Sequence, residues 1–392
     1  MSSQKSFTLE VASEPARKEA RTCPGLLTSS IVVDRIQALL SIFTGTLIMI
    51  IGIFGMLLLL PGFIIAKLLH PKATSTATNA SLTEGGSATA VLTLMSRSQM
   101  TLMNAGGPDA LAPLLIRHKS ILGTVFGPVW GGALWSKVYL YMLRINFYIT
   151  KRILQDQTAR WEPQEPIGGL CTYLQCRTCW FDDCVEAFHR LHEGKKTNLV
   201  ILGAGYDTRC YRLPHLKNFA TYEVDTPNSQ AAKLHSLKVA GIETGSTVFV
   251  NCDFVSQDWL VQLHLSGFDR SLPTLLVWEG VTMYLPKEVV GATLKQVSGL
   301  AEGSCIGFDY LDSAWIFSPA AQKAAKGAGE PVVFGLTGEE PEELVASKKL
   351  FMLDHLKRDE LVDRYVAKHC DGRPVGHIGD FGGFVLAGNF EM

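Results

Sequence analysis

A glycine-containing loop directly follows a short apolar run in the second half of the chain. The run at 198–202 (NLVIL) has the length and composition of a buried strand, and it continues into GAGYDTR at 203–209. Glycines at such a point let the backbone come close to a ligand at the carboxyl end of the strand, where open α/β sheets bind their ligands. The pattern indicates a nucleotide-type cofactor site, although an ordinary tight turn from strand to helix would also explain it.

The next strand-like run ends in a carboxylate. Asp225 closes YEVD at 222–225, 22 positions after Gly203, where it can accept hydrogen bonds from ribose hydroxyls. The spacing suits a dinucleotide fold, but the loop lacks a third glycine and contains Asp207 instead. An acid repels a pyrophosphate and attracts a sulfonium or an ammonium group. The residues therefore favour S-adenosylmethionine over NAD, and an NAD-dependent oxidoreductase remains an alternative.

Two further strand-like runs end in acidic residues. Asp253 and Phe254 follow the run at 247–250, where the carboxylate can accept from an adenine amino group and the ring can pack on the base. Glu279 closes the run at 274–278 (TLLVW). Because the carboxyl ends of parallel strands meet at one edge of a sheet, we expect these groups to surround one ligand.

The elements that must position these groups alternate between strand and helix. Strand-like runs lie at 198–202, 220–224, 247–250, 274–278 and 305–310, and amphipathic segments lie near 227–240, 256–265 and 286–301. This alternation predicts an α/β fold with a parallel sheet covered on both faces. The C-terminal part adds an apolar run at 351–353, a helix near 357–368 and a strand at 381–386. We predict one catalytic domain over 166–392.

Five ordered motifs carry a family resemblance. They are RTCWFDDCV at 177–185, LVILGAGYDTRCYRL at 199–213, YEVDTP at 222–227, NCDF at 251–254 and WEGVTMYL at 278–285. From about Gln155 to the C-terminus the chain resembles the S-adenosylmethionine-dependent methyltransferases of the leucine carboxyl methyltransferase family, within a wider family of O-methyltransferases. The resemblance implies a class I methyltransferase fold: a Rossmann-like, seven-stranded sheet whose last strand is antiparallel.

The resemblance also implies roles for individual residues. Arg177 matches the arginine that pairs with the cofactor's carboxylate, Gly203 the turn glycine and Asp225 the ribose-binding acid. Asp253 and Phe254 match the adenine-contacting pair, and Glu279 matches the acid near the methionine moiety.

Catalytic residues are harder to assign than cofactor-binding ones. Tyr206 and Arg209 of the glycine loop are candidates for orienting the methyl acceptor. A carboxylate acceptor, on a small molecule or a protein, is already anionic and needs no base, whereas a hydroxyl acceptor needs one. No residue identifies itself as that base, which mildly favours a carboxylate. No metal site is predicted, because the cysteines at 171, 176, 179 and 184 lack a second pair or histidines at zinc-finger spacing.

Composition excludes one class of partner and predicts another. The formal net charge is −1, which leaves no basic field for nucleic acid, while 47% of residues are apolar and 19% are charged. Residues 38–66 contain no charged residue or histidine, and 38–60 would span roughly 34 Å as a helix, enough to cross a bilayer. The sequence therefore predicts a single transmembrane helix within 36–69. A signal peptide is the alternative.

The flanking segments complete the predicted organisation. Residues 1–35 are predicted to be a disordered polar N-terminus, 70–90 a low-complexity tether containing the sequon Asn79-Ala80-Ser81, and 91–165 a helical lid or membrane-proximal segment in which 121–135 could enter the bilayer. Cofactor supply and nine cysteines without a disulfide pattern favour a membrane protein with a cytosolic catalytic domain, while basic residues before the helix favour the opposite orientation. A non-catalytic, membrane-anchored binding module on the same fold is the alternative function.

Overall fold

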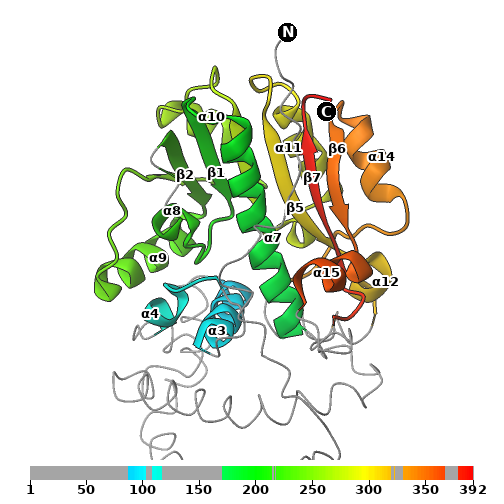
Figure 1. Ribbon diagram of the computed structural model, residues 1–392, viewed down its shortest axis with the longest axis horizontal. Coiled ribbons are helices and arrows are strands. Elements are labelled where there is room, and N and C mark those ends of the chain that lie inside the picture. Colours follow the sequence, from blue (N-terminus) through cyan, green and yellow to red (C-terminus); the bar gives the residue numbers. More distant parts are fainter. Residues whose placement is uncertain are drawn as a thin grey trace, which may run out of the picture.

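The computed structural model describes residues 87–102, 108–116, 170–213, 216, 218–318, 322, 330–366 and 378–391. Its centre is a seven-stranded sheet in the order β3-β2-β1-β4-β5-β7-β6 (Figure 1). The strands are β1 (Thr197–Leu202), β2 (Phe219–Asp225), β3 (Val248–Asn251), β4 (Thr274–Trp278), β5 (Cys305–Leu311), β6 (Phe351–Leu356) and β7 (Gly382–Gly388).

The strand directions agree with the fold that the resemblance implies. The pairs β1–β2, β2–β3, β1–β4 and β4–β5 are parallel. The last strand, β7, inserts between β5 and β6 and is antiparallel to both. The chain order reverses beside β1, so the ends of β1, β2 and β4 form the crevice in which open α/β sheets bind ligands. The predicted α/β class I methyltransferase sheet is thereby confirmed.

Helices cover both faces of the sheet because β1, β4 and β5 are apolar on both sides. On one face, α7 (Leu170–Leu191) packs its aromatic residues Trp180, Phe181 and Phe188 against the sheet. The opposite face buries side chains of α10 (Trp259–Leu265), α11 (Lys287–Val297) and α14 (Glu340–Ser347). The other helical elements that flank the sheet are α8 (Arg209–Arg212), α9 (Pro227–Ala240), η2 (Thr282–Tyr284), α12 (Ser313–Ile316) and α15 (Arg358–Tyr365).

Two helices from the N-terminal half lie against the glycine loop. α3 (Ala88–Leu102) and α4 (Ala112–Ile116) form a separate apolar cluster with Tyr206 and with Leu237 of α9. Since Tyr206 lies just beyond β1, this cluster places α3 at the carboxyl edge of the sheet, next to the predicted site (Figure 1). The contact ties a segment that is distant in the sequence to the predicted catalytic domain.

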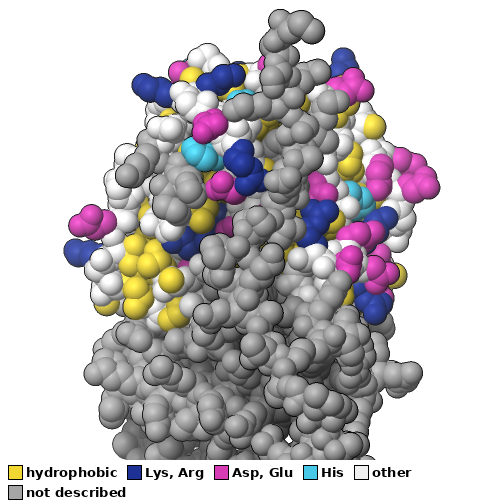
Figure 2. Space-filling model, in the orientation of Figure 1, with side chains coloured by type: hydrophobic (Ala, Val, Ile, Leu, Met, Phe, Trp, Pro, Cys, Tyr) yellow, Lys and Arg dark blue, Asp and Glu magenta, His cyan; other side chains and the backbone are white. Residues whose placement is uncertain are grey.

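The surface carries two compositional features in the view of Figure 2. Acidic side chains gather over α14, whose first turn holds Glu340, Glu342 and Glu343. Hydrophobic side chains gather on the side of α9, where Leu234 and Val239 are exposed.

The observed boundaries correct some predictions. α3 begins at Ala88, inside the 70–90 tract predicted to be a tether. The helix α14 was not predicted, because its first turn is acidic and contains a proline. The predicted N-terminus (1–35), the predicted transmembrane helix (36–69) and most of the predicted lid lie outside the described residues. Within the residues that are described, no helix is both long and apolar enough to cross a membrane.

Candidate active site

The glycine loop is held in a conformation that requires glycine. Gly203 has a φ of +69°, in the left-handed region, and a Cβ placed there would lie 2.4 Å from Cγ2 of Val281. Gly205, with a φ of +42°, lies under Ala90 of α3, whose Cβ would be 3.4 Å from a Cβ on that glycine. The loop after β1 is thus enclosed by the segment after β4 on one side and by α3 on the other.

Asp225 lies beside this loop. Its carboxylate accepts hydrogen bonds from the backbone N–H groups of Gly205 (2.6 Å) and Thr226 (2.7 Å). Burial raises the pKa of Asp225, and the two N–H groups act in the opposite direction. The predicted ribose-binding acid and the predicted cofactor loop are therefore direct neighbours in the crevice between β1 and β2.

Arg177 is placed by α7 over the ends of β4 and β5. Its Nε donates to Glu279 Oε1 and its Nη1 to Asp309 Oδ2, both at 3.0 Å. Asp309 Oδ1 accepts from the N–H of Gly280 at 2.6 Å. The guanidinium lies close against Gly280, where a Cβ would be 3.2 Å from Nη1. Within the described residues, Nε and Nη1 make these bonds and Nη2 makes none. Nη2 can therefore meet a ligand carboxylate.

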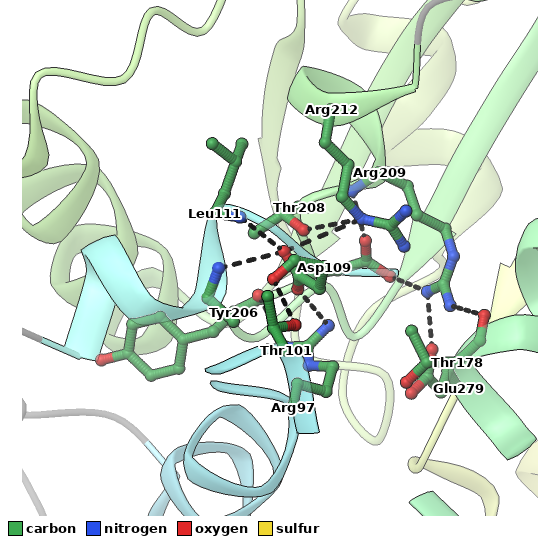
Figure 3. A network of polar contacts seen from close by, with 12 residues as sticks. Arg97, Thr101, Asp109, Leu111, Thr178, Tyr206, Thr208, Arg209, Arg212 and Glu279 are labelled. Atoms are coloured by element: carbon green, nitrogen blue, oxygen red, sulfur yellow. Dashed lines mark hydrogen bonds and ion pairs between the residues drawn. The ribbon is translucent and has the colours of Figure 1, made fainter. Parts of the chain in front are cut away.

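Arg209 is completely buried and bridges the glycine loop to Glu279 (Figure 3). Its Nη1 donates to Asp207 Oδ2 (2.5 Å) and to Glu279 Oε2 (2.6 Å), and its Nε donates to Asp182 (2.8 Å). Burial alone would raise the pKa of both Asp207 and Glu279, but the neighbouring arginine charges outweigh it and lower both values. The sequence suggested that Asp207 attracts the sulfonium of the cofactor. In the structure, its charge is already paired with Arg209.

The ion pairs continue from Arg209 to α3. Asp182 also accepts from Arg212, whose Nε lies 3.8 Å from Asp109, and Asp109 lies 3.5 Å from Arg97 of α3. Within the described residues, the connected group contains four arginines and five carboxylates, which leaves one negative formal charge in excess: Arg97, Arg177, Arg209, Arg212, Asp109, Asp182, Asp207, Glu279 and Asp309. Such an excess suits a ligand that carries positive charge.

The two candidates for orienting the acceptor have little exposed surface. The Tyr206 side chain points away from the ion pairs (Figure 3) and packs in the α3–α4 cluster, where burial raises its pKa to about 12. Arg209 is occupied by three carboxylates and the carbonyl oxygen of Thr178. In this arrangement the Tyr206 side chain contributes to packing and the Arg209 side chain to ion pairing.

Asp253 and Phe254 lie one strand farther along the sheet edge. The N–H of Cys252 donates to the carbonyl oxygen of Asp225 at 2.8 Å, which sets this loop beside the β2 end. The Asp253 carboxylate is exposed and accepts from the Val255 N–H (3.0 Å) and the Ser256 hydroxyl (2.9 Å). Phe254 packs partly on the core. The pair lies at the correct edge but makes no direct contact with the ion-pair group.

Several polar residues of the site were not found from the sequence. Asp309 is fully buried in β5, and an acid in the middle of the run CIGFDY was the available signal. Glu330 accepts a hydrogen bond from the Thr89 hydroxyl of α3, and Tyr284 of η2 interacts with the same threonine. These three residues lie more than 20 positions from one another in the sequence, and Thr89 is farther still, so no local pattern could reveal their contacts.

The residues present fit S-adenosylmethionine. A glycine-only loop lets the backbone approach a ligand, Asp225 stands beside it for the ribose, and a buried arginine stands near Glu279 for the amino-acid end. The excess negative charge matches a cofactor that carries a sulfonium and an ammonium group.

The sheet and this site define an S-adenosylmethionine-dependent methyltransferase. Comparison with known proteins agrees: residues 141–298 match the leucine carboxyl methyltransferase family. A Mycolicibacterium gilvum protein, assigned by name to the S-adenosyl-L-methionine-dependent methyltransferases, is 33% identical over 221 residues, which cover 52% of this chain and 70% of that protein. The similarly assigned YktD of Bacillus subtilis is 32% identical over 182 residues, covering 44% and 60%. The chain belongs to the leucine carboxyl methyltransferase family, and the NAD alternative is not supported.

Solved structures show only a general likeness. A DUF574 family protein from Streptomyces avermitilis aligns with a TM-score of 0.41 and 13% identity, over 55% of this chain and 84% of that one. The magnesium protoporphyrin IX methyltransferase of Synechocystis, solved with S-adenosylhomocysteine bound, aligns with a TM-score of 0.36 and 9% identity, over 64% and 97%. Scores this low carry no argument about the acceptor.

Proposed function

We propose that this protein transfers the methyl group of S-adenosylmethionine to an oxygen atom of a carboxylate, on a small molecule or on a protein. The proposal rests on one observation: Glu279 pairs with both Arg177 and Arg209 at the ends of β1 and β4, next to a loop in which only glycine fits at position 203. Family membership supports the carboxylate, since the family is described by carboxyl methylation.

The chain's own contribution is to position and to desolvate. The bound cofactor supplies an electrophilic methyl group, and an aligned nucleophile in a dry site gains several orders of magnitude in effective concentration. In this proposal Asp225 holds the ribose, Asp253 and Phe254 hold the adenine, and Arg177 and Glu279 hold the amino-acid end. The helix α3, which lies over Gly205, excludes water from the loop.

A hydroxyl acceptor is the second candidate, because one carboxylate is suitably placed to serve it. Glu330 is partly buried beside Thr89 and Tyr284, on the α3 side of the glycine loop. A hydroxyl that donates to this carboxylate could pass its proton to it as the new oxygen–carbon bond forms. A carboxylate acceptor would have no use for such a base.

One labelling experiment separates the two candidates. The full-length chain is incubated with cofactor labelled in the methyl group and with an extract of the cells that express it, beside an Asp225→Ala control. A methyl ester releases labelled methanol in mild alkali, whereas a methyl ether retains its label. Alkali-labile label that depends on Asp225 supports the carboxylate. Alkali-stable label that Glu330→Gln abolishes, with cofactor affinity unchanged, supports the hydroxyl, and no Asp225-dependent label contradicts both.

Attachment to a membrane through residues 36–69, with a cytosolic catalytic domain, is a proposal that rests on the hydrophobic run alone. The sequon at Asn79 supplies the test. Expressed in a eukaryotic cell, the chain is expected to show no glycosidase-sensitive mass shift if residues 121–135 do not recross the bilayer, and its catalytic domain is expected to be digested in vesicles whose cytosolic face is outward. A shift that Asn79→Gln abolishes would show that the tether is lumenal. Protection of the domain would contradict its cytosolic placement.

A further inference from the structure

One buried hydroxyl near the ion pairs has no hydrogen-bond partner within the described residues. Tyr173 of α7 is 2% exposed, and its hydroxyl neither donates to nor accepts from any group. Its ring packs on Phe381 and Phe384, with centroid distances of 5.4 and 5.2 Å. A buried polar group without a partner destabilises a protein, so the hydroxyl has a stability cost that the unliganded protein does not recover.

The position of Tyr173 on its helix connects it to the cofactor site. It precedes Arg177 by four residues, so the two side chains lie on the same face of α7. The charges of Asp309, Arg177 and Glu279 all act on its hydroxyl. Asp309 accepts from the Gly280 N–H and from Arg177 Nη1, and it makes no hydrogen bond with the Tyr173 hydroxyl. Among the described residues, this hydroxyl therefore has no protein acceptor.

The hydroxyl is suited to donate rather than to accept a proton. Burial, followed by the charge of Asp309, raises the pKa of Tyr173 well above its ordinary value. A neutral phenol beside a guanidinium offers a carboxylate one more donor, and hydrogen bonds to an ionised acceptor are the strong ones.

We propose that Tyr173 is a cofactor-binding residue, whose hydroxyl donates to the carboxylate at the methionine end of S-adenosylmethionine beside Arg177. The inference rests on the proposed function, because it needs this cofactor in this site. It explains why a tyrosine stands where phenylalanine would pack equally well against Phe381 and Phe384.

The test compares two ligands that differ only in this carboxylate. Calorimetry measures the affinity of the full-length wild type and of Tyr173→Phe for S-adenosylmethionine and for its decarboxylated form. The variant is expected to bind S-adenosylmethionine about tenfold to a hundredfold more weakly, as expected for a lost hydrogen bond to a charged group. Its affinity for the decarboxylated form is expected to stay within about twofold.

The stability of the unliganded protein provides a second, independent readout. Tyr173→Phe removes a hydroxyl without a partner, so its melting temperature is expected to rise by about 2 to 4 °C. The matched control is Tyr222→Phe, which removes from a buried tyrosine a hydroxyl that donates to the Gly267 carbonyl oxygen at 3.1 Å. The control is expected to melt at a lower temperature and to bind the cofactor as the wild type does.

Three results would overturn the inference. Unchanged affinity for S-adenosylmethionine would remove the contact, and equal weakening for both ligands would show a general effect on the fold. Unchanged affinity with reduced methyl transfer would instead assign the hydroxyl to the acceptor. Failure of the wild type itself to bind S-adenosylmethionine would contradict the proposed function, and is thereby distinguishable from the failure of Tyr173.

Discussion

Replacing Arg209 by lysine tests whether this residue holds the fold or orients an acceptor. The guanidinium is fully buried and makes four hydrogen bonds, at 2.5 to 3.1 Å, to Asp182, Asp207, Glu279 and the Thr178 carbonyl oxygen. Lysine keeps the charge but has one ammonium group with three donors, and it cannot reach acceptors on opposite sides of a planar fork.

The size of the effect follows from the number of bonds lost. An ammonium at the position of Nη1 can keep the bonds to Asp207 and Glu279, but lysine forfeits the bond to the Asp182 carboxylate, at about 1.5 to 3 kcal/mol, and the bond to the neutral Thr178 carbonyl oxygen, at about 0.5 to 1.5 kcal/mol. We expect Arg209→Lys to lower the free energy of unfolding by about 3 to 5 kcal/mol, the range for breaking a buried ion pair. That is a large share of the roughly 5 to 15 kcal/mol that stabilises a domain.

The assay is urea unfolding of the full-length protein, followed by tryptophan fluorescence, because Trp180 and Trp278 are completely buried. The matched control is Arg190→Lys, at a residue whose side chain is 43% exposed and lies 3.6 Å from Glu186. An exposed pair of this kind contributes about 0 to 1 kcal/mol, so the control is expected to unfold nearly as the wild type does.

The refuting result is equally definite. If Arg209→Lys unfolds within about 1 kcal/mol of the Arg190→Lys control, the ion pairs do not stabilise the fold as argued. If in addition it binds S-adenosylhomocysteine normally and loses methyl transfer, the role of orienting the acceptor returns to Arg209.

Three further predictions concern the glycine loop and its neighbours. Asp225→Ala is expected to weaken binding of S-adenosylhomocysteine by about 1 to 3 kcal/mol in calorimetry, and unchanged affinity would contradict its assignment to the ribose. Gly203→Ala is expected to destabilise the protein more than Gly194→Ala. Both residues have positive φ, but only at position 203 would the added Cβ meet Val281. Equal midpoints of urea unfolding for the two variants would refute this contact. Burial raises the pKa of Asp207, but the neighbouring guanidinium outweighs it and lowers the pKa below the unfolded value. Its stabilisation is therefore complete above about pH 4 and disappears as the pH falls through the folded pKa, so the stability difference between wild type and Asp207→Asn should be constant from about pH 5 to 8 and shrink in acid.

Most of the sheet was predictable from local sequence. The runs at 198–202 and 274–278 lie within β1 and β4, because continuous apolar runs of this length are typical of buried strands. The segment at 227–240 coincides with α9, although three of the side chains that this helix buries, Gln230, Lys233 and Ser236, are polar. The helix α14 was missed, since its acidic first turn conceals the period. Asp225 was found for a similar local reason: it ends a strand at the edge where ligands bind.

The partners within the site were decided only by the tertiary structure. Residue type and spacing identified Gly203, Asp225 and Glu279 as members of one site, because the ends of parallel strands meet at one edge, and the family resemblance added Arg177. They could not show that Glu279 is shared between Arg177 and Arg209, which come from different helices.

The same limit applies to the roles of the loop residues and to Asp309. A sequence places Tyr206 and Arg209 in the cofactor loop, but the direction of each side chain depends on what packs there, and α3 and α7 supply those partners from far along the chain. Burial then determines their chemistry, since a charge without water must find a protein partner. The sequence by itself determined the class of sheet, the cofactor and the edge at which it binds. Only the packing of distant helices decided which charges pair with one another.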